Sequence, residues 1–237
     1  MHTLQDYLDL SAEIPGWTRG PEAEALIQQA YDLPGDAVVV EVGTFFGSGA
    51  VLLGGARKLR GSGHVHCIDP FDGSGDRVSV PHYHAIRLAF YGKTQQEHFD
   101  AHVRRAGLDQ WITPHAGTAE AIALNWTTPI DLLFLDGDQS PAGARSAFDA
   151  WSPWLKPGGV LALHNSAPRE YEADHDGHFQ LTQTVAVEPA YQFIQLVGST
   201  SYLTKVATQF NARRRSPAAP ARNRALRADH TVQPSIF

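Results

Sequence analysis

The sequence has a single cysteine, Cys67, and no apolar stretch that approaches the roughly 18–20 residues of a membrane-spanning helix. One thiol cannot form an internal disulfide, so a reducing compartment, the cytoplasm, is expected. Cys67 lies in the apolar run HVHCID, which favours a buried strand residue over a nucleophile. The N-terminus lacks the basic and apolar segments of a secretory signal, so neither export nor contact with a membrane is expected.

Basic residues are scarce in most of the chain. Six of the 19 basic residues but one of the 25 acidic residues lie at 212–237, which leaves 13 against 24, a net charge of −11, before residue 212. This balance argues against a nucleic acid as substrate or partner. The Arg-, Pro- and Ala-rich segment 212–237 is predicted to be a disordered tail. It is either a solvated terminus or an arm that contacts the acidic body of another subunit in a homo-oligomer.

Between residues 36 and 211, short apolar runs alternate with stretches of helical pattern. The predicted strands are 38–43, 64–69, 111–117 and 130–137, and a fifth begins at 160–164 after a turn at 156–159. The predicted helices are 49–59, 94–106, 118–124 and 142–154, and the segment 70–91 is expected to be irregular. Such alternation predicts an α/β fold with a doubly wound, mainly parallel sheet that helices cover on both faces.

Different patterns occupy the two ends of this region. Helical patterns at 4–10 and 21–31 predict an N-terminal helical region, residues 1–35, before the domain at 36–211. The runs YQFIQLV (191–197) and SYLTKVA (201–207) are separated by a Gly-Ser turn. They predict a terminal β-hairpin, which adds an antiparallel element to the sheet.

In such a sheet the ligand lies at the carboxyl ends of the strands. At the first of these ends, EVGTFFGSG, Gly43 lets the backbone approach a ligand and Gly47 permits a tight entry into the helix. A dinucleotide site would instead use GxGxxG around a pyrophosphate, an anion beside which Glu41 is unfavourable. Glu41 suits a cationic ligand, and a glycine-rich turn that binds nothing is the alternative.

Two further strand ends carry candidate binding residues. Asp69 ends the second predicted strand, where a carboxylate can accept both ribose hydroxyls of an adenosine or can simply serve a turn. After the third strand, the small residues of AGTAE at 116–120 leave a surface on which an adenine can lie flat.

The order EVGTFFGSG, CIDPF, HAGTAE, DLLFLDGDQS and WSPWLKPGGVLALHN, within residues 36–207, resembles the class I S-adenosylmethionine-dependent methyltransferases. It is most similar to bacterial small-molecule O-methyltransferases with DGDHS and HD motifs. The resemblance implies a Rossmann-like, seven-stranded sheet that ends in the antiparallel hairpin. It also implies a cofactor, S-adenosyl-L-methionine, whose methionine part is surrounded by Glu41, Gly43 and Gly47, whose ribose meets Asp69, whose adenine meets Gly117, Thr118 and Ala119, and which Asp136 also contacts.

A divalent metal is a second implication of the resemblance. Related catechol-type enzymes hold magnesium at positions that correspond here to Asp136, His164 and Asn165. A cation beside the methyl donor would chelate a diol and lower the pKa of a hydroxyl. Magnesium prefers oxygen ligands, whereas the imidazole of His164 suits softer transition metals. The sequence therefore leaves a metal-assisted and a metal-free reaction both open.

The catalytic base is the least defined element. The related enzymes have a lysine or a histidine three residues after the first metal-binding Asp, where this chain has Gln139, an amide that cannot take a proton at neutral pH. Asp138 and His164 are therefore the predicted catalytic residues, with a purely structural histidine as the alternative for His164.

The expected function is O-methylation of a small-molecule hydroxyl, on a sugar or a phenolic secondary metabolite. Loops at 70–91 and 169–178 are expected to shape the acceptor site. One alternative is a catalytically degenerate S-adenosylmethionine-binding protein, which Gln139 and His164 keep open. The other is a nicotinamide-dependent oxidoreductase, against which Glu41 and the missing GxGxxG argue.

Overall fold

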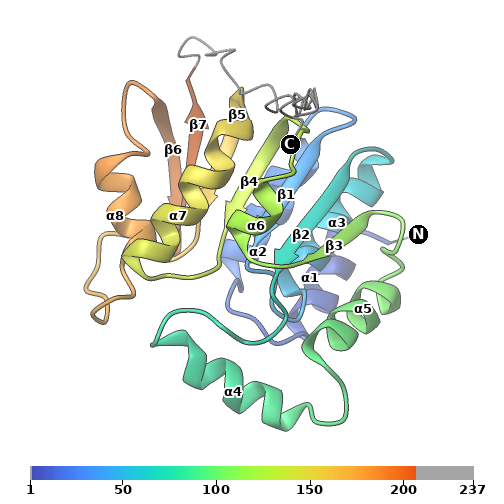
Figure 1. Cartoon of the computed structure of the whole chain (residues 1–237). Coiled ribbons are helices and arrows are strands. Elements are labelled where there is room, and N and C mark those ends of the chain that lie inside the picture. Colours follow the sequence, from blue (N-terminus) through green and yellow to red (C-terminus); the bar gives the residue numbers. More distant parts are fainter. Residues whose placement is uncertain (1, 207–237) are drawn as a thin grey trace, which may run out of the picture.

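A computed structural model describes residues 2–206 and shows one seven-stranded sheet (Figure 1). The strand order is β3-β2-β1-β4-β5-β7-β6. Successive strands are added on one side of β1 up to β3, and β4 then pairs on the other side of β1, which places the topological switch point between β1 and β4. Pairing is parallel from β3 to β5, and β7 is antiparallel to both β5 and β6. The predicted fold is confirmed. The strands are Val38–Val42, His64–Asp69, Ile112–Ala116, Ile130–Leu135, Leu155–Leu163, Tyr191–Val197 and Thr200–Lys205, β1 to β7 in chain order.

Helices cover both faces of the sheet because its central strands are apolar on both sides. In β1, Val39 packs into one core and its neighbour Val40 into the other. The first core is closed by α1 (Leu4–Ala12), α2 (Pro21–Asp32), α3 (Ser48–Arg60) and α5 (Gln95–Arg105). The second is closed by α6 (Ala119–Ala123), α7 (Pro141–Trp151) and α8 (Gly177–Thr184), and a short 3₁₀ turn, Ser152–Trp154, follows α7. Cys67 is buried in the first core, as predicted.

The N-terminal helices α1 and α2 pack into the first core. Tyr7 of α1 is fully buried, and a Cβ built at Gly55 of α3 would lie 2.3 Å from its ring. Arg57 of α3 is also buried and donates to the carbonyl of Ala30 at 2.8 Å and of Pro34 at 2.9 Å, at the end of α2. These contacts seat the predicted N-terminal region on α3.

The segment 70–91 differs from the prediction of an irregular loop, which is wrong over α4 (Ser79–Ala89). Within α4 only Ser79 is buried, and Tyr83 and Ile86 are half-buried against the first core, so its apolar face is narrower than that of a core helix. Asp76 starts the helix, because its carboxylate accepts from the backbone N–H of Val78 at 2.9 Å and of Ser79 at 3.0 Å. The helix lies at the carboxyl edge of the sheet, outside both layers (Figure 1).

Two smaller differences lie in the second half of the chain. The predicted polar loop at 169–178 ends inside α8, and the predicted turn at 156–159 is part of β5, with a register shift opposite Ile130 and Leu132. The predicted tail at 212–237 lies outside the described residues. Within residues 2–206, no helix combines the length and the apolar character that crossing a membrane requires.

A histidine cluster at the β2–β3 edge predicts a pH dependence of stability. His66 Nδ1 and His115 Nε2 are 3.0 Å apart, a hydrogen bond that needs one ring nitrogen without a proton. Burial lowers the pKa of His64, His66 and His115, that of His66 to about 4. The unfolded chain therefore binds protons that the folded chain excludes, and stability is lost as the pH falls from about 6.5 to about 4.

We expect His66→Gln to remove part of this loss. A pKa lowered from 6.5 to about 4 corresponds to about 3 kcal/mol, which solvent at this partly exposed site reduces to roughly half. Urea unfolding of both proteins at neutral pH and near pH 4.5 measures the difference. His82→Gln on the exposed side of α4 is the matched control. An equal acid sensitivity of wild type and His66→Gln would contradict the assignment.

Candidate active site

A cavity of about 310 Å³ opens at the carboxyl edge of the sheet. Segments that follow β1, β2, β3 and β4 meet there, at the place where ligands bind in doubly wound sheets. Among the residues predicted for cofactor binding and catalysis, those that line this cavity are Gly43, Asp69, Gly117, Thr118, Ala119, Asp136 and Asp138. The cavity is acidic, because Asp69, Glu120, Asp136 and Asp138 line it and no Lys, Arg or His does.

The loops after β1 and β4 touch at Gly43. A Cβ at this position would lie 2.3 Å from the Cα of Gly137, and the φ of +90° is in the region that favours glycine. Phe45, two residues on, has a φ of +49° although it carries a side chain. Such strained backbone gathers at functional sites. Here it turns the Phe45 N–H toward Asp69, which accepts it at 2.8 Å.

Asp69 is the best-anchored carboxylate of the cavity. Its Oδ1 accepts from Phe71 N at 2.7 Å and from Gln95 Nε2 at 3.2 Å, and its Oδ2 accepts from Phe45 N. Burial raises its pKa to about 6, although the two backbone donors act in the opposite direction. Since Oδ2 accepts only this one described hydrogen bond, it can still receive a hydroxyl proton.

Glu41 lies in a smaller cavity of about 30 Å³, which it shares with Gly43 and Asp136. The carboxyl group is buried and accepts from Thr44 Oγ1 at 2.6 Å. Burial, with the nearby charges of Asp136 and Asp69, raises the pKa of Glu41 to about 8. A cationic group in this cavity would stabilise the ionised carboxylate of Glu41 and so lower its pKa again.

Gly47 and the turn residues Gly117 and Thr118 differ in outcome. Gly47 lines neither of these two cavities, because it caps α3 with a φ of +93° and faces the ring of Phe99. Thr118 lines the large cavity and also caps α6, since its hydroxyl accepts from Ala121 N at 3.3 Å. Gly117 is tied to the end of β2, where its N–H donates to the Asp69 carbonyl at 3.0 Å.

Gln95, Trp17 and Phe45, which sequence reasoning did not single out, also form the site, together with Tyr83 of the segment 70–91 that was expected to shape it. Gln95, at the start of α5, is buried beside Asp69, and its Oε1 has no hydrogen-bond partner within the described chain. The rings of Trp17, Phe45 and Tyr83 lie 5.0–5.5 Å apart, centroid to centroid, and line the small cavity. They come from the N-terminal segment, the β1 loop and α4. For Trp17 and Phe45, the aromatic character of the residue was the only signal in the sequence.

Asp136 and His164 meet in a buried ion pair. His164 Nδ1 lies 2.6 Å from Asp136 Oδ1, and its Nε2 lies 3.6 Å from Glu22 Oε2 of α2. Burial alone would lower the pKa of His164, but the two carboxylates outweigh it and raise that pKa to about 10. The two carboxylates thus favour the imidazolium form, in which neither ring nitrogen has a lone pair that can accept a proton.

The third predicted ligand is also engaged. Asn165 Oδ1 accepts from Arg169 at 2.9 Å, so its amide oxygen is not directed at Asp136 or His164 by any described contact. Among residues 2–206, no three His, Cys, Asp or Glu side chains converge on a common cation position. The predicted set of Asp136, His164 and Asn165 does not fit a divalent metal.

Asp138 and Gln139 differ in exposure. Asp138 is exposed at the cavity wall, and its Oδ1 accepts from Ser140 N at 2.8 Å, which leaves Oδ2 accessible. Gln139 is 3% exposed, and its Oε1 has no hydrogen-bond partner within residues 2–206. Its backbone N–H donates to Asp76 at 3.3 Å, and Asp76 also binds His175 at 3.1 Å. Asp76 thus joins the loops after β2, β4 and β5.

Comparison with known proteins gives one family and many structures. A family model described as a methyltransferase domain matches residues 40–166. The O-methyltransferase TomG from Streptomyces achromogenes, solved in complex with S-adenosylmethionine, is 18% identical, with a TM-score of 0.57 over 86% of this chain and 89% of TomG. An O-methyltransferase from Bacillus cereus, in complex with S-adenosylhomocysteine, is 18% identical, with a TM-score of 0.55 over 85% of this chain and 90% of that one.

A third structure with this fold is named for a different kind of substrate. An rRNA methylase from Streptococcus thermophilus is 14% identical, with a TM-score of 0.53 over 81% of this chain and 99% of that one. At these identities the similarity shows the fold alone. The acceptor must therefore be argued from the residues of the site itself.

Proposed function

The chain belongs to the methyltransferase-domain family matched over residues 40–166, and from this premise we propose that it transfers a methyl group from S-adenosyl-L-methionine to a hydroxyl of a small molecule. The observation that carries the proposal is the acidic cavity at the carboxyl edge of the sheet, in which Gly43, Asp69, Gly117 and Asp136 lie together. Its acidic lining, which includes Asp138 and Glu120, disfavours the pyrophosphate of a nicotinamide cofactor.

Each wall of the cavity suits one part of this cofactor. Asp69 Oδ2 and the unpartnered Oε1 of Gln95 can accept the two ribose hydroxyls, and the turn at 117–119 borders the adenine. The carboxyl groups of Glu41 and Asp136 attract the positively charged amino-acid end. When bound, S-adenosylmethionine supplies an electrophilic methyl group on a cationic sulfonium.

The acceptor is proposed to be an uncharged sugar or phenol. The rings of Trp17, Phe45 and Tyr83 provide a stacking surface, and neither cavity is lined by a Lys or Arg that would pair with an anion. A nucleic acid is disfavoured for the same reason. Positioning of the hydroxyl against the methyl carbon carries most of the acceleration, since methyl transfer is an in-line displacement.

Asp138 is the proposed proton acceptor, because its exposed carboxylate lines the cavity and keeps Oδ2 accessible. His164 is proposed to act as a charged positioning residue, which holds the Asp136 carboxylate at the cavity wall. Since the predicted ligand set does not fit a divalent cation, no metal is included in the mechanism. We expect EDTA to leave turnover unchanged.

The test is formation of S-adenosylhomocysteine from S-adenosylmethionine with a panel of uncharged phenols and sugars. We expect turnover with at least one of them, and a loss of about 100-fold in kcat for Asp138→Asn, within the range of a positioned base. Calorimetry with S-adenosylhomocysteine and with NAD separates the alternatives. Binding of the former without turnover of any acceptor would favour a degenerate binding protein, and binding of NAD alone would refute the proposal.

The pKa of Glu41 predicts how cofactor affinity varies with pH. Its carboxyl group is protonated below about pH 8 in the free protein, and a cationic ligand favours the carboxylate. Binding therefore releases a proton, and affinity rises with pH toward about 8 by at most tenfold per unit, then levels off. Calorimetry with S-adenosylhomocysteine between about pH 6 and 8.5 measures this slope. Glu41→Gln should flatten it, and an unchanged slope in that variant would assign the proton to another group.

A further inference from the structure

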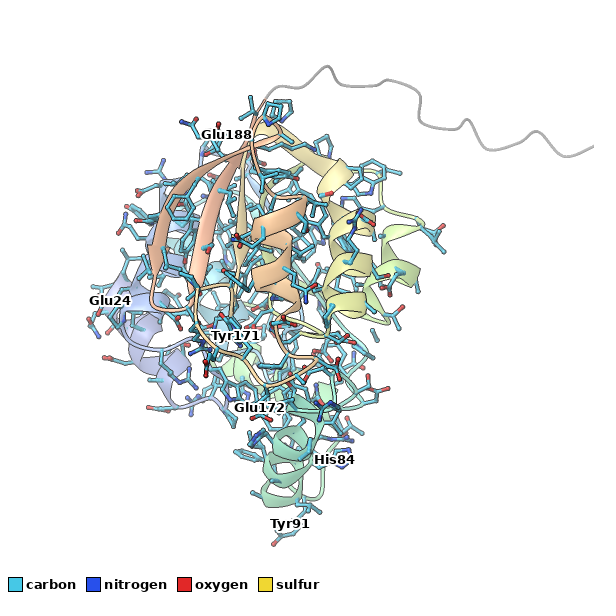
Figure 2. All side chains as sticks on the ribbon, turned by 90° about the vertical axis from the view of Figure 1, so that its left-hand side faces the viewer. Glu24, His84, Tyr91, Tyr171, Glu172 and Glu188 are labelled. Atoms are coloured by element: carbon cyan, nitrogen blue, oxygen red, sulfur yellow. The ribbon has the colours of Figure 1, made fainter. Side chains whose placement is uncertain are left out.

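A second cavity lies between α4 and α5, outside the site described above. Its volume is about 360 Å³. Its apolar walls are Phe46 of the β1 loop, Leu88 of α4, and Phe90 and Tyr91 just after α4. Leu88 is 78% exposed and Tyr91 is 89% exposed, large apolar side chains that no described element covers. Figure 2 shows His84 and Tyr91 at this end of the molecule, with Tyr91 at its tip.

The polar walls of this cavity are all basic or neutral. His84, Arg87, Lys93 and His98 line it, and no Asp or Glu does. In a chain with a net charge of −6, this is a local reversal of sign beside a cofactor cavity that is itself acidic. Arg87 is held in place by a hydrogen bond to the Asp72 carbonyl, and His98 Nε2 donates to the Phe90 carbonyl at 2.9 Å.

We propose that this cavity binds a small amphipathic anion: an aromatic or aliphatic body with a carboxylate, sulfonate or phosphate group. The body packs against Phe46, Leu88 and Tyr91, and the anionic group pairs with Lys93 and Arg87. The terminal segment of this chain does not suit the site, because residues 207–237 carry six arginines and one Asp, and basic walls repel it.

The cavity adjoins the proposed cofactor site through Gln95, which lines both. The Gln95 amide donates to Asp69 Oδ1 at 3.2 Å and to the Phe45 carbonyl at 3.4 Å. An anion that shifts this side chain therefore changes the setting of Asp69. Anion and cofactor are coupled by this contact, and the coupling is reciprocal.

The test uses 8-anilinonaphthalene-1-sulfonate, an aromatic sulfonate whose fluorescence reports binding directly and requires no methyl transfer. We expect one saturable site on the folded protein. Lys93→Glu and Leu88→Asp should each weaken binding at least tenfold. The matched controls are Arg145→Glu on α7 and Leu124→Asp, whose leucine is 84% exposed, and both should bind as wild type does. N-phenyl-1-naphthylamine, which lacks the sulfonate, should bind at least tenfold more weakly.

Four results would overturn the proposal. The first is equal affinity for the charged and uncharged probes, and the second is equal weakening by the control variants. The third is complete displacement of the probe by S-adenosylhomocysteine together with an unchanged probe affinity in Lys93→Glu, which would put the probe in the cofactor cavity. The fourth is a dimer in sedimentation that Lys93→Glu dissociates, which would make a second copy the occupant. Since the readout is binding of the probe, failure of the proposed methyl transfer would leave it intact.

Discussion

Replacing Asp69 by alanine is expected to weaken binding of S-adenosylhomocysteine by about 100-fold. Hydrogen bonds to a charged acceptor contribute about 1.5–3 kcal/mol each, and 1.4 kcal/mol corresponds to tenfold in affinity. Asp69 Oδ2 has a free accepting position in the cavity, and the carboxylate also holds Phe45 and Phe71, both with positive φ. The loss therefore combines a missing contact to the ribose with a looser β1 loop.

Two further variants separate these causes. Asp69→Asn keeps one oxygen and the size of the side chain but loses the charge, so we expect a smaller loss, about tenfold. Asp72→Ala, three residues along the same loop, removes an exposed carboxylate that accepts from Ser74 N and should change affinity little. Calorimetry measures all three, after circular dichroism has confirmed folding. An affinity within about threefold of wild type in a folded Asp69→Ala protein would refute the ribose role.

Sequence reasoning predicted the parts of the fold that depend on the composition of a single short segment. The β-branched run of β1 and the apolar run of β4 predict buried strands by composition alone, and parallel pairing brings their carboxyl ends to one edge. Asp69 and the turn at 117–119 were placed in the same cavity by this rule. Neither needed a long-range contact to be recognised.

The parts that were missed depend on contacts between distant segments. Helix α4 buries only Ser79 completely, and Tyr83 and Ile86 are its half-buried contacts with the first core, so its apolar face is narrow. Glu22 has the composition of an ordinary first-turn acid in α2, and nothing near it in the sequence indicates His164 or the Ser199 hydroxyl that donates to it at 2.7 Å. Trp17 reaches the site only because α1 and α2 seat the intervening segment on α3.

The role of His164 depends on the side chains around it and could not be assigned from its position in related enzymes alone. An imidazole at the end of β5 is a plausible ligand or base if Asp136 is its only neighbour. Glu22 is a second acid, and its pKa is lowered to about 2, because hydrogen bonds from His164 and Ser199 outweigh the effect of burial. Two carboxylates about one imidazole favour its protonated form, in which neither ring nitrogen is a ligand or a base.

Replacing His164 by leucine is accordingly expected to lower the free energy of unfolding by about 3–5 kcal/mol, the cost of removing one partner from a buried ion pair. The carboxylates of Asp136 and Glu22, whose side chains are 20% and 13% exposed, would lose their counter-charge. Urea unfolding at pH 7 measures the loss. Adding Glu22→Gln to His164→Leu should restore part of it, because one of the two unpaired charges is then removed.

The pH dependence tests the same charge. With a folded pKa of about 10 against an unfolded value of 6.5, the contribution of His164 is complete below pH 6.5 and is lost as the pH rises toward 10. The wild type should therefore lose stability between pH 7 and about 10, and His164→Leu should lose less over that range. A metal ligand would behave differently, since it must be neutral to bind and its contribution would disappear with EDTA. A change of less than about 1 kcal/mol in His164→Leu, together with EDTA-sensitive stability of the wild type, would therefore restore the metal site and remove the ion network.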